Sequence, residues 1–453
     1  MTLRDARGLA TSSANRRSLD AFEVALGQFQ CYRGNSIATI DAALAADSEF
    51  AFGQIFRAEV HISAWEASVL PEVETSLRAL EKLGNKCNDR ERAHVAAIRD
   101  WHVGDWDGFR ARFDLLLAEH PRDALALQIG HLADFFHGDR DNLRGRMMRA
   151  LPAWNRELPG YGFTLGMQAF GLEECGDYRR AEETARHAIE LEPDDCWAHH
   201  ALAHVLEMEA RQVEGIALME SRRDHWAQED NGFAFHNWWH TALYNLDQDR
   251  ADRALEIYDR SIRPGQSEIQ TEMLDATALL WRVHLRGIDV GKRWHDLAAA
   301  YDKTAQDGFY AFNDMHAMIA YVATGRCEAA KRLLAGATRA AEKSGANARM
   351  EREAGLPIMR AVEAFGRGQY DTAVELLMPV RYRAHVFGGS HAQRDIIHRT
   401  LIEAALRDGQ FALANALATE RTQLKPDCPF SWQLRNRAEA GIAGRGGVAM
   451  PPR

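Results

Sequence analysis

The sequence lacks several patterns that mark whole classes of protein. Its six cysteines contain no CxxC pair and share no spacing, which disfavours a disulfide framework and favours reduced thiols. No apolar run approaches the roughly 18 residues of a membrane span. No dense Lys/Arg run accompanies the net charge of −10. We therefore expect a cytoplasmic protein that binds neither membranes nor nucleic acid.

Strand signals are nearly absent as well. Alternating runs of β-branched residues do not occur, and Ala, Leu, Arg and Glu dominate, which favours an all-α protein. The polar start, residues 1–17, predicts a flexible N-terminus, and the Gly/Pro-rich end, residues 441–453, predicts a disordered tail. The 18–440 region between them is expected to form a single helical array.

A period of about 34 residues runs through this region. In residues 162–195, Gly176-Asp177-Tyr178 marks a turn between two helices, and Ala181 and Ala188 mark positions where the helices approach closely. The same turn signal recurs at Gly104, Gly138, Gly325, Gly368 and Gly409. Together these windows predict about nine helix pairs in a right-handed, tetratricopeptide-type solenoid, long enough to close around a central cavity. The alternative is an α protein of separate, non-repeating domains.

Four histidines stand at matched positions in two consecutive repeats. His200 and His204 are four residues apart, as are His236 and His240, and the second pair follows the first by 36 residues. Because residues four apart share a helix face, both pairs are expected to converge on the concave side of the array. Four neutral imidazoles form a candidate site for a divalent metal such as zinc, iron, copper or nickel.

Two other interpretations of this histidine cluster remain open. It can form a pocket for a small polar ligand, with Glu207 as a catalytic base one turn from His204. It can also be a structural network in which the histidines bond to Asn237, Glu207 and the backbone. The sequence contains no HExxH motif that would decide for a metal.

Two later blocks add polar side chains at expected helix starts. The first block contains Asn313, Asp314 and His316. Asn313 and Asp314 are good helix-capping residues, which is one explanation of the block. The alternative is that Asp314 or His316 reaches a ligand at the inner mouth of the array, where either is a catalytic candidate. Ser390 and Gln393 predict a capping box. The adjoining His391, Arg394 and Asp395 are candidate ligand-binding residues, because exposed amides and an arginine favour an anion.

These blocks resemble the tetratricopeptide repeat protein 38 family. The resemblance rests on residues 203–208, 215–216, 236–244, 279–282, 313–318 and 388–395, and extends from about Phe22 to Arg437. It implies an all-α repeat fold and no particular reaction. One departure is Glu209-Ala210-Arg211, where the resemblance implies a Gly-Arg turn.

Three functions follow as hypotheses. The first is a repeat protein that binds a small polar ligand or a peptide in its His/Asn/Asp-lined pocket. The second is an enzyme, a metal-assisted or acid/base hydrolase or lyase that uses the histidine cluster. The third is a scaffold for protein partners, which is the usual role of such repeats.

Overall fold

The computed structural model describes residues 3–304 and 307–446, and its regular secondary structure there is helical. The extended pairings in this part are two isolated bridges, Arg4 with Ala10 and Arg33 with Asn231. The predicted fold class, an all-α helical repeat of tetratricopeptide type, is confirmed. Among the described residues, no helix combines the length and the apolar composition needed to cross a bilayer.

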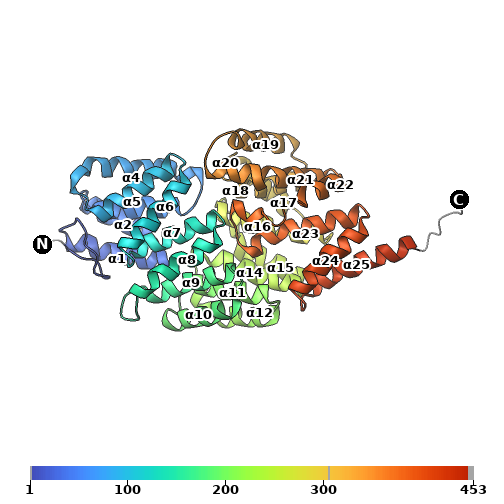
Figure 1. The fold of residues 1–453 in the computed structure, drawn as a ribbon, viewed down its shortest axis with the longest axis horizontal. Coiled ribbons are helices and arrows are strands. Elements are labelled where there is room, and N and C mark those ends of the chain that lie inside the picture. Colours follow the sequence, from blue (N-terminus) through green and yellow to red (C-terminus); the bar gives the residue numbers. More distant parts are fainter. Residues whose placement is uncertain (1–2, 305–306, 447–453) are drawn as a thin grey trace. The chain divides into compact units, whose positions relative to one another are not determined.

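The helices divide between two compact units, each of which takes several segments of the chain (Figure 1). Unit 1 comprises residues 1–205, 222–237 and 343–349, and unit 2 comprises 206–221, 238–342 and 350–453. Helices in unit 1 are α1 (Arg16–Cys31), α2 (Ser36–Ala46), α3 (Ala51–Ile62), α4 (Leu70–Leu83), α5 (Asp89–His102), α6 (Trp106–Glu119), α7 (Ala124–Phe136), α8 (Arg140–Ala150), α9 (Tyr161–Glu174), α10 (Tyr178–Leu191) and α13 (Arg223–Trp226). Helices in unit 2 are α12 (Gln212–Ser221), α15 (Ala251–Ile257), α16 (Gln270–Leu285), α17 (Arg293–Thr304), α18 (Ala311–Ala323), α19 (Cys327–Ala341), α21 (Leu356–Gly366), α22 (Tyr370–Leu377), α23 (His391–Arg407), α24 (Phe411–Leu424) and α25 (Pro429–Gly446). Three helices have residues in both units: α11 (Cys196–Met208), α14 (Ala234–Asp247) and α20 (Ala346–Met350).

The predicted turn glycines end the first helices of their pairs. Gly176, between α9 and α10, has a φ of 78°, which lies in the left-handed region that a side chain disfavours. The equivalent glycines also have positive φ: Gly104, Gly138, Gly325, Gly368 and Gly409. One such turn contains no glycine. It follows the end of α11 at Met208, and there Ala210 takes a φ of 59°. Residues 209–211, where the resemblance implies a Gly-Arg turn, therefore form the turn without a glycine, and Ala210 takes the strained conformation.

Small residues let α9 and α10 pack closely. Ala181, Ala185 and Ala188 are buried along one face of α10. Ala181 lies in a cluster with Leu172 and Val205, which come from α9 and α11. The predicted register of this repeat is confirmed.

We expect Ala181→Leu to lower the free energy of unfolding by about 1–3 kcal/mol, because three added carbon atoms must displace well-packed neighbours. The exposed Glu183 on the same helix supplies the control, and Glu183→Ala is expected to cost less than about 0.5 kcal/mol. Urea denaturation followed by circular dichroism measures both. Equal losses would show that the helix faces are wrongly assigned.

Part of each terminal segment lies within the described residues. Arg7 is buried and bonds to both carboxylate oxygens of Glu23 at 2.9 Å, and the Asn88 side chain donates to the carbonyl of Ala10 at 3.1 Å. The described part of the N-terminal segment, for which the sequence predicted flexibility, is thus held against α1 and α5. At the other end α25 runs to Gly446, into the predicted tail, and residues 447–453 lie outside the described residues.

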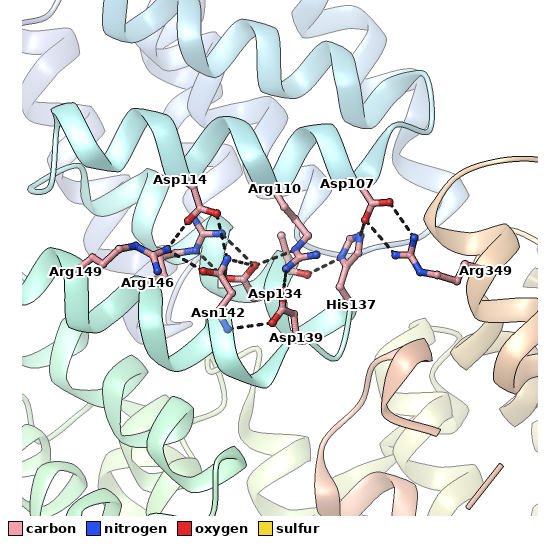
Figure 2. A network of polar contacts seen from close by, with 11 residues as sticks. Asp107, Arg110, Asp114, Asp134, His137, Asp139, Asn142, Arg146, Arg149 and Arg349 are labelled. Carbon is pink, nitrogen blue, oxygen red and sulfur yellow. Dashed lines mark hydrogen bonds and ion pairs between the residues drawn. The ribbon is translucent and has the colours of Figure 1, made fainter. Parts of the chain in front are cut away.

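A buried ion network joins α6, α7 and α8 in unit 1 (Figure 2). Its centre is Asp134, which is fully buried and accepts from Arg146 Nε at 2.7 Å, Arg146 Nη2 at 3.0 Å and Arg110 Nε at 2.9 Å. Burial alone would raise the pKa of Asp134, but the two guanidinium groups bring it below its ordinary value. At one end of the network Arg349 pairs with Asp107 through two contacts of 3.2 Å (Figure 2).

Candidate functional site

The N-cap of α11 fixes the start of the histidine-bearing segment. Asp195 Oδ1 accepts from the backbone N–H groups of Trp197 at 2.9 Å and Ala198 at 3.0 Å. This sets the helical register, so that Trp197, His200 and His204 follow one another on one face. Asn237, on α14, donates from Nδ2 to the Cys196 carbonyl at 3.2 Å and so ties the start of α14 to that of α11.

Three of the four predicted histidines come together within unit 1. One ring nitrogen from each of His200, His204 and His236 lies within 4.8 Å of the others. The Nε2 atoms of His200 and His236 are 3.1 Å apart. All three side chains are buried, so they form an enclosed cluster. Their position on the concave side of the array stays a prediction.

Aromatic rings hold the three imidazoles in place. Phe170 stacks on His200 with a centroid separation of 5.0 Å and meets His204 edge-on at 5.3 Å. Phe233 lies 5.2 Å from His200 and 5.0 Å from His236. This apolar shell restricts the ring orientations and keeps bulk water away from the nitrogens.

A pair of glutamates at the end of α9 lies beside the cluster. Glu173 and Glu174 are both buried, and each offers an oxygen within 4.8 Å of a His204 nitrogen. Glu173 Oε2 is 3.5 Å from His204 Nδ1. The sequence analysis missed both carboxylates. The sequence offered one signal, which was an acidic pair just before the Gly176 turn, one repeat ahead of His204. Whether this pair lies close to His204 depends on how the two repeats stack.

The fourth histidine belongs to unit 2, where it has a carboxylate partner of its own. His240 Nδ1 and Glu207 Oε2 are 3.0 Å apart, and both side chains are buried. Burial would raise the pKa of Glu207, but the His240 hydrogen bond and the charge of Lys425 hold it below its ordinary value. His240 as a fourth ligand to the cluster stays a prediction from the sequence.

Asp314 and His316 are buried in unit 2. The helix that carries them has Tyr310, and not Asn313 or Asp314, at its N-cap position. His316 Nδ1 bonds to the Phe312 carbonyl at 2.8 Å within its own helix. Burial raises the pKa of Asp314 and of its neighbour Glu351, and the charge of Asp314 raises that of Glu351 further, so at least one of the two carboxyl groups holds a proton near neutral pH. Asn313 and Asp314 line a small pocket with Tyr301 and Tyr310, and this pocket has room for about one water molecule. Their role in ligand binding stays a prediction.

The third block forms the predicted capping box. The Ser390 side chain accepts from the Gln393 backbone at 3.2 Å, and the Gln393 side chain accepts from the Ser390 backbone at 3.0 Å. Arg394 donates to the Gly389 carbonyl and lies 3.5 Å from His391. Asp395 bonds to Arg399 at 2.6 Å and to Arg421, which lowers its pKa well below the usual range despite burial. Anion binding at this block stays a prediction.

Comparison with known proteins finds solved structures of low sequence identity. No family model matches the chain. Similar solved structures include human IFIT1 in its dimer with m7Gppp-AAAA, with 13% identity over 95% of this chain and 96% of that chain at a TM-score of 0.41. Another is Cut9 in the APC/C hetero-tetramer Cut9-Hcn1, with 13% identity over 93% and 76% at a TM-score of 0.43. Yeast Tom70 shows 12% identity over 95% and 88% at 0.35. The resemblance to the tetratricopeptide repeat protein 38 family stays a prediction.

Proposed function

We propose that the protein binds a transition-metal ion through His200, His204 and His236. The observation that carries this is the convergence of three buried imidazole nitrogens, from two helices, within 4.8 Å. Neutral imidazole nitrogen is a common ligand of transition-metal ions, and one cation can accept a lone pair from each of the three rings.

The distance between two ring nitrogens fits a shared ion. Ligands about 2.0–2.1 Å from a tetrahedral zinc are about 3.3 Å from each other. The His200 and His236 Nε2 atoms are 3.1 Å apart. A hydrogen bond between the same nitrogens needs a proton on one of them, so the two explanations differ in whether a metal displaces that proton.

The nearby carboxylates fit the surroundings of a metal-bound histidine. A ligating imidazole commonly directs its other nitrogen to a carboxylate, which fixes the ring and makes it a stronger ligand. Glu173, 3.5 Å from His204 Nδ1, is placed for this role. Imidazole and carboxylate together favour zinc, nickel, iron or copper over calcium or magnesium.

Metal-assisted acid/base catalysis is the second candidate function, and the observation that favours it is the pair Glu173 and Glu174. Three histidines leave a tetrahedral ion one position for water or substrate, and a bound metal lowers the pKa of that water toward 7. A carboxylate beside the ligand His204 is then placed to accept a proton. The surfaces of the repeats remain available to a peptide or protein partner.

Metal analysis of the full chain, purified without a histidine tag, tests the proposal. We expect about one equivalent of zinc, nickel, iron or copper per chain, and restoration of that equivalent when the chelated protein is titrated with Zn²⁺ or Co²⁺. Co²⁺ also reports its coordination through its visible spectrum. The double variant His204→Gln, His236→Gln is expected to bind at least about 100-fold more weakly, and Glu173→Gln about 10–100-fold more weakly.

His187 provides the matched control, because it is an exposed histidine on α10, outside the cluster. His187→Gln is expected to bind metal like the unmodified chain. Circular dichroism checks that each variant is folded. Failure of the unmodified chain to bind any of the four metals, or equal binding by the double variant and the control, would overturn the proposal.

A further inference from the structure

A second group of potential metal ligands adjoins the three-histidine cluster in unit 1. Glu173, Glu174 and His204 each offer one ligand atom, and these three atoms lie within 4.8 Å of one another. All three side chains are buried. The group shares His204 with the three-histidine cluster. It combines carboxylate and imidazole ligands, whereas the first cluster contains imidazoles only.

The separation of Glu173 from His204 fits two ligands of one ion better than a hydrogen bond. Glu173 Oε2 lies 3.5 Å from His204 Nδ1. A charge-assisted hydrogen bond between a nitrogen and a carboxylate oxygen is about 2.7–2.9 Å long. Two ligands about 2.0–2.2 Å from one tetrahedral zinc ion lie about 3.4 Å apart. An ion bound to both atoms is therefore compatible with their separation.

The electrostatics at the end of α9 also favour a cation. Glu173 and Glu174 are the last two residues of this helix, where the aligned peptide dipoles leave a partial negative charge. The last turn, residues 171–174, contains no Lys, Arg or His. Two neighbouring carboxylates also repel each other when both are buried. A protonated His204 offsets one of their negative charges, whereas one divalent ion offsets both.

We propose that Glu173, Glu174 and His204 bind a second divalent transition-metal ion, and that His204 bridges it to the ion of the three-histidine site. This inference rests on the proposed function, because the two ions share one imidazole. His204 Nδ1, which lies beside Glu173, is the ligand of the second ion, and Nε2 then remains for the first. The imidazole N–H loses its proton to solvent, and the resulting imidazolate offers one lone pair to each ion.

The two sites differ in affinity. Three neutral imidazoles bind the first ion without losing a proton, whereas the second ion has to displace the proton of His204. The second site therefore binds the same metal more weakly. A purified chain is expected to keep about one equivalent, and the second enters when Zn²⁺ or Co²⁺ is in excess. Zinc suits this site because it accepts both imidazole and carboxylate ligands.

Titration of the chelated full chain with Co²⁺ tests the proposal. Metal content, the EPR signal and the release of protons into a weakly buffered solution are measured at each step. The second equivalent is expected to bind more weakly than the first and to release about one proton from His204. Two Co²⁺ ions joined by an imidazolate couple magnetically, so the second equivalent is expected to add less than its own share to the EPR signal.

Glu174→Gln keeps the size of the side chain and removes its charge. It is expected to weaken the second equivalent at least about 10-fold, which is the loss typical even of a partner outside the ligand shell. The first equivalent is expected to bind as before. Glu183→Gln, at an exposed glutamate of α10, is the matched control and is expected to bind both equivalents like the unmodified chain.

The double variant His200→Gln, His236→Gln separates the two sites, because it removes two ligands of the first ion and none of the second. It is expected to lose one equivalent and the magnetic coupling, and to keep the equivalent that depends on Glu174. Binding that depends on Glu174 but not on His200 and His236 would contradict the three-histidine site and the bridge. A single equivalent at saturating Co²⁺, or full binding of two by folded Glu174→Gln, would overturn the second site. The stoichiometry of the unmodified chain decides even if a variant does not fold.

Discussion

Replacing Asp134 by alanine is expected to lower the free energy of unfolding by about 3–5 kcal/mol, because it leaves the buried Arg146 guanidinium without its main partner. Arg146 is almost fully buried and makes two of its hydrogen bonds to Asp134 (Figure 2). The half-buried Arg110 also loses one of its two carboxylate partners. The midpoint of urea unfolding, followed by circular dichroism, measures the loss.

Asp141 on α8 is the matched control for Asp134. It is exposed and pairs with Arg144 at 3.4 Å on the helix surface. Asp141→Ala is expected to cost less than about 0.5 kcal/mol. The double variant Asp134→Leu, Arg146→Met removes both buried charges and should recover part of the loss. A destabilisation by Asp134→Ala no larger than that of the control would show that Arg146 finds water or another partner.

Replacing Asp195 by asparagine is expected to stabilise the protein at pH 7.5 and to have little effect near pH 4. Burial raises the pKa of this carboxyl to about 8 in the folded protein, whereas the unfolded chain releases the proton near pH 4. The folded state therefore binds more protons between these two values, and the unmodified chain loses stability as pH rises through that window. Each pH unit within it contributes up to about 1.4 kcal/mol.

Asparagine removes this titration and still accepts the two backbone N–H groups at the start of α11, so the helix keeps its cap. The stability difference between variant and unmodified chain should grow from pH 4.5 to pH 7.5 and level off above pH 8. Urea unfolding at four or more pH values measures it. Asp194→Asn, at the exposed neighbouring carboxylate, is the matched control and is expected to change the free energy of unfolding at pH 7.5 by less than about 0.5 kcal/mol. Parallel stability curves for Asp195→Asn and the unmodified chain would contradict the prediction.

The sequence predicted local features of this protein well. The turn glycines, the capping box of Ser390 and Gln393, and the buried alanines of α10 are set by interactions within one repeat or between adjacent helices, and short spacings reveal them. The convergence of His200, His204 and His236 was also accessible, because two helices one repeat apart place equivalent positions side by side.

The burial of polar side chains and their partners from distant segments could not be predicted from short spacings. The sequence gives no measure of how completely neighbouring helices cover a polar side chain, so the burial of His204, Asp314 and His316 could not be predicted from it. Glu173 and Glu174 carry no motif of their own, and their relevance appears only when α9 and α11 are packed together. A protonated Asp195 likewise depends on desolvation, which no residue pattern encodes.

The order in which the chain is synthesised bears on the pair between Arg349 and Asp107. Residues 343–349 complete unit 1. Arg349 is synthesised 242 residues after Asp107, the α6 carboxylate with which it pairs. At translation rates of about 5–20 residues per second, the delay is roughly 10–50 s. During that interval Asp107 lacks its guanidinium partner, and the earlier segments of unit 1 fold without their last piece. A ribosome stalled before residue 343 would therefore present a nascent unit 1 that is still open at Asp107 to other cationic segments or to chaperones.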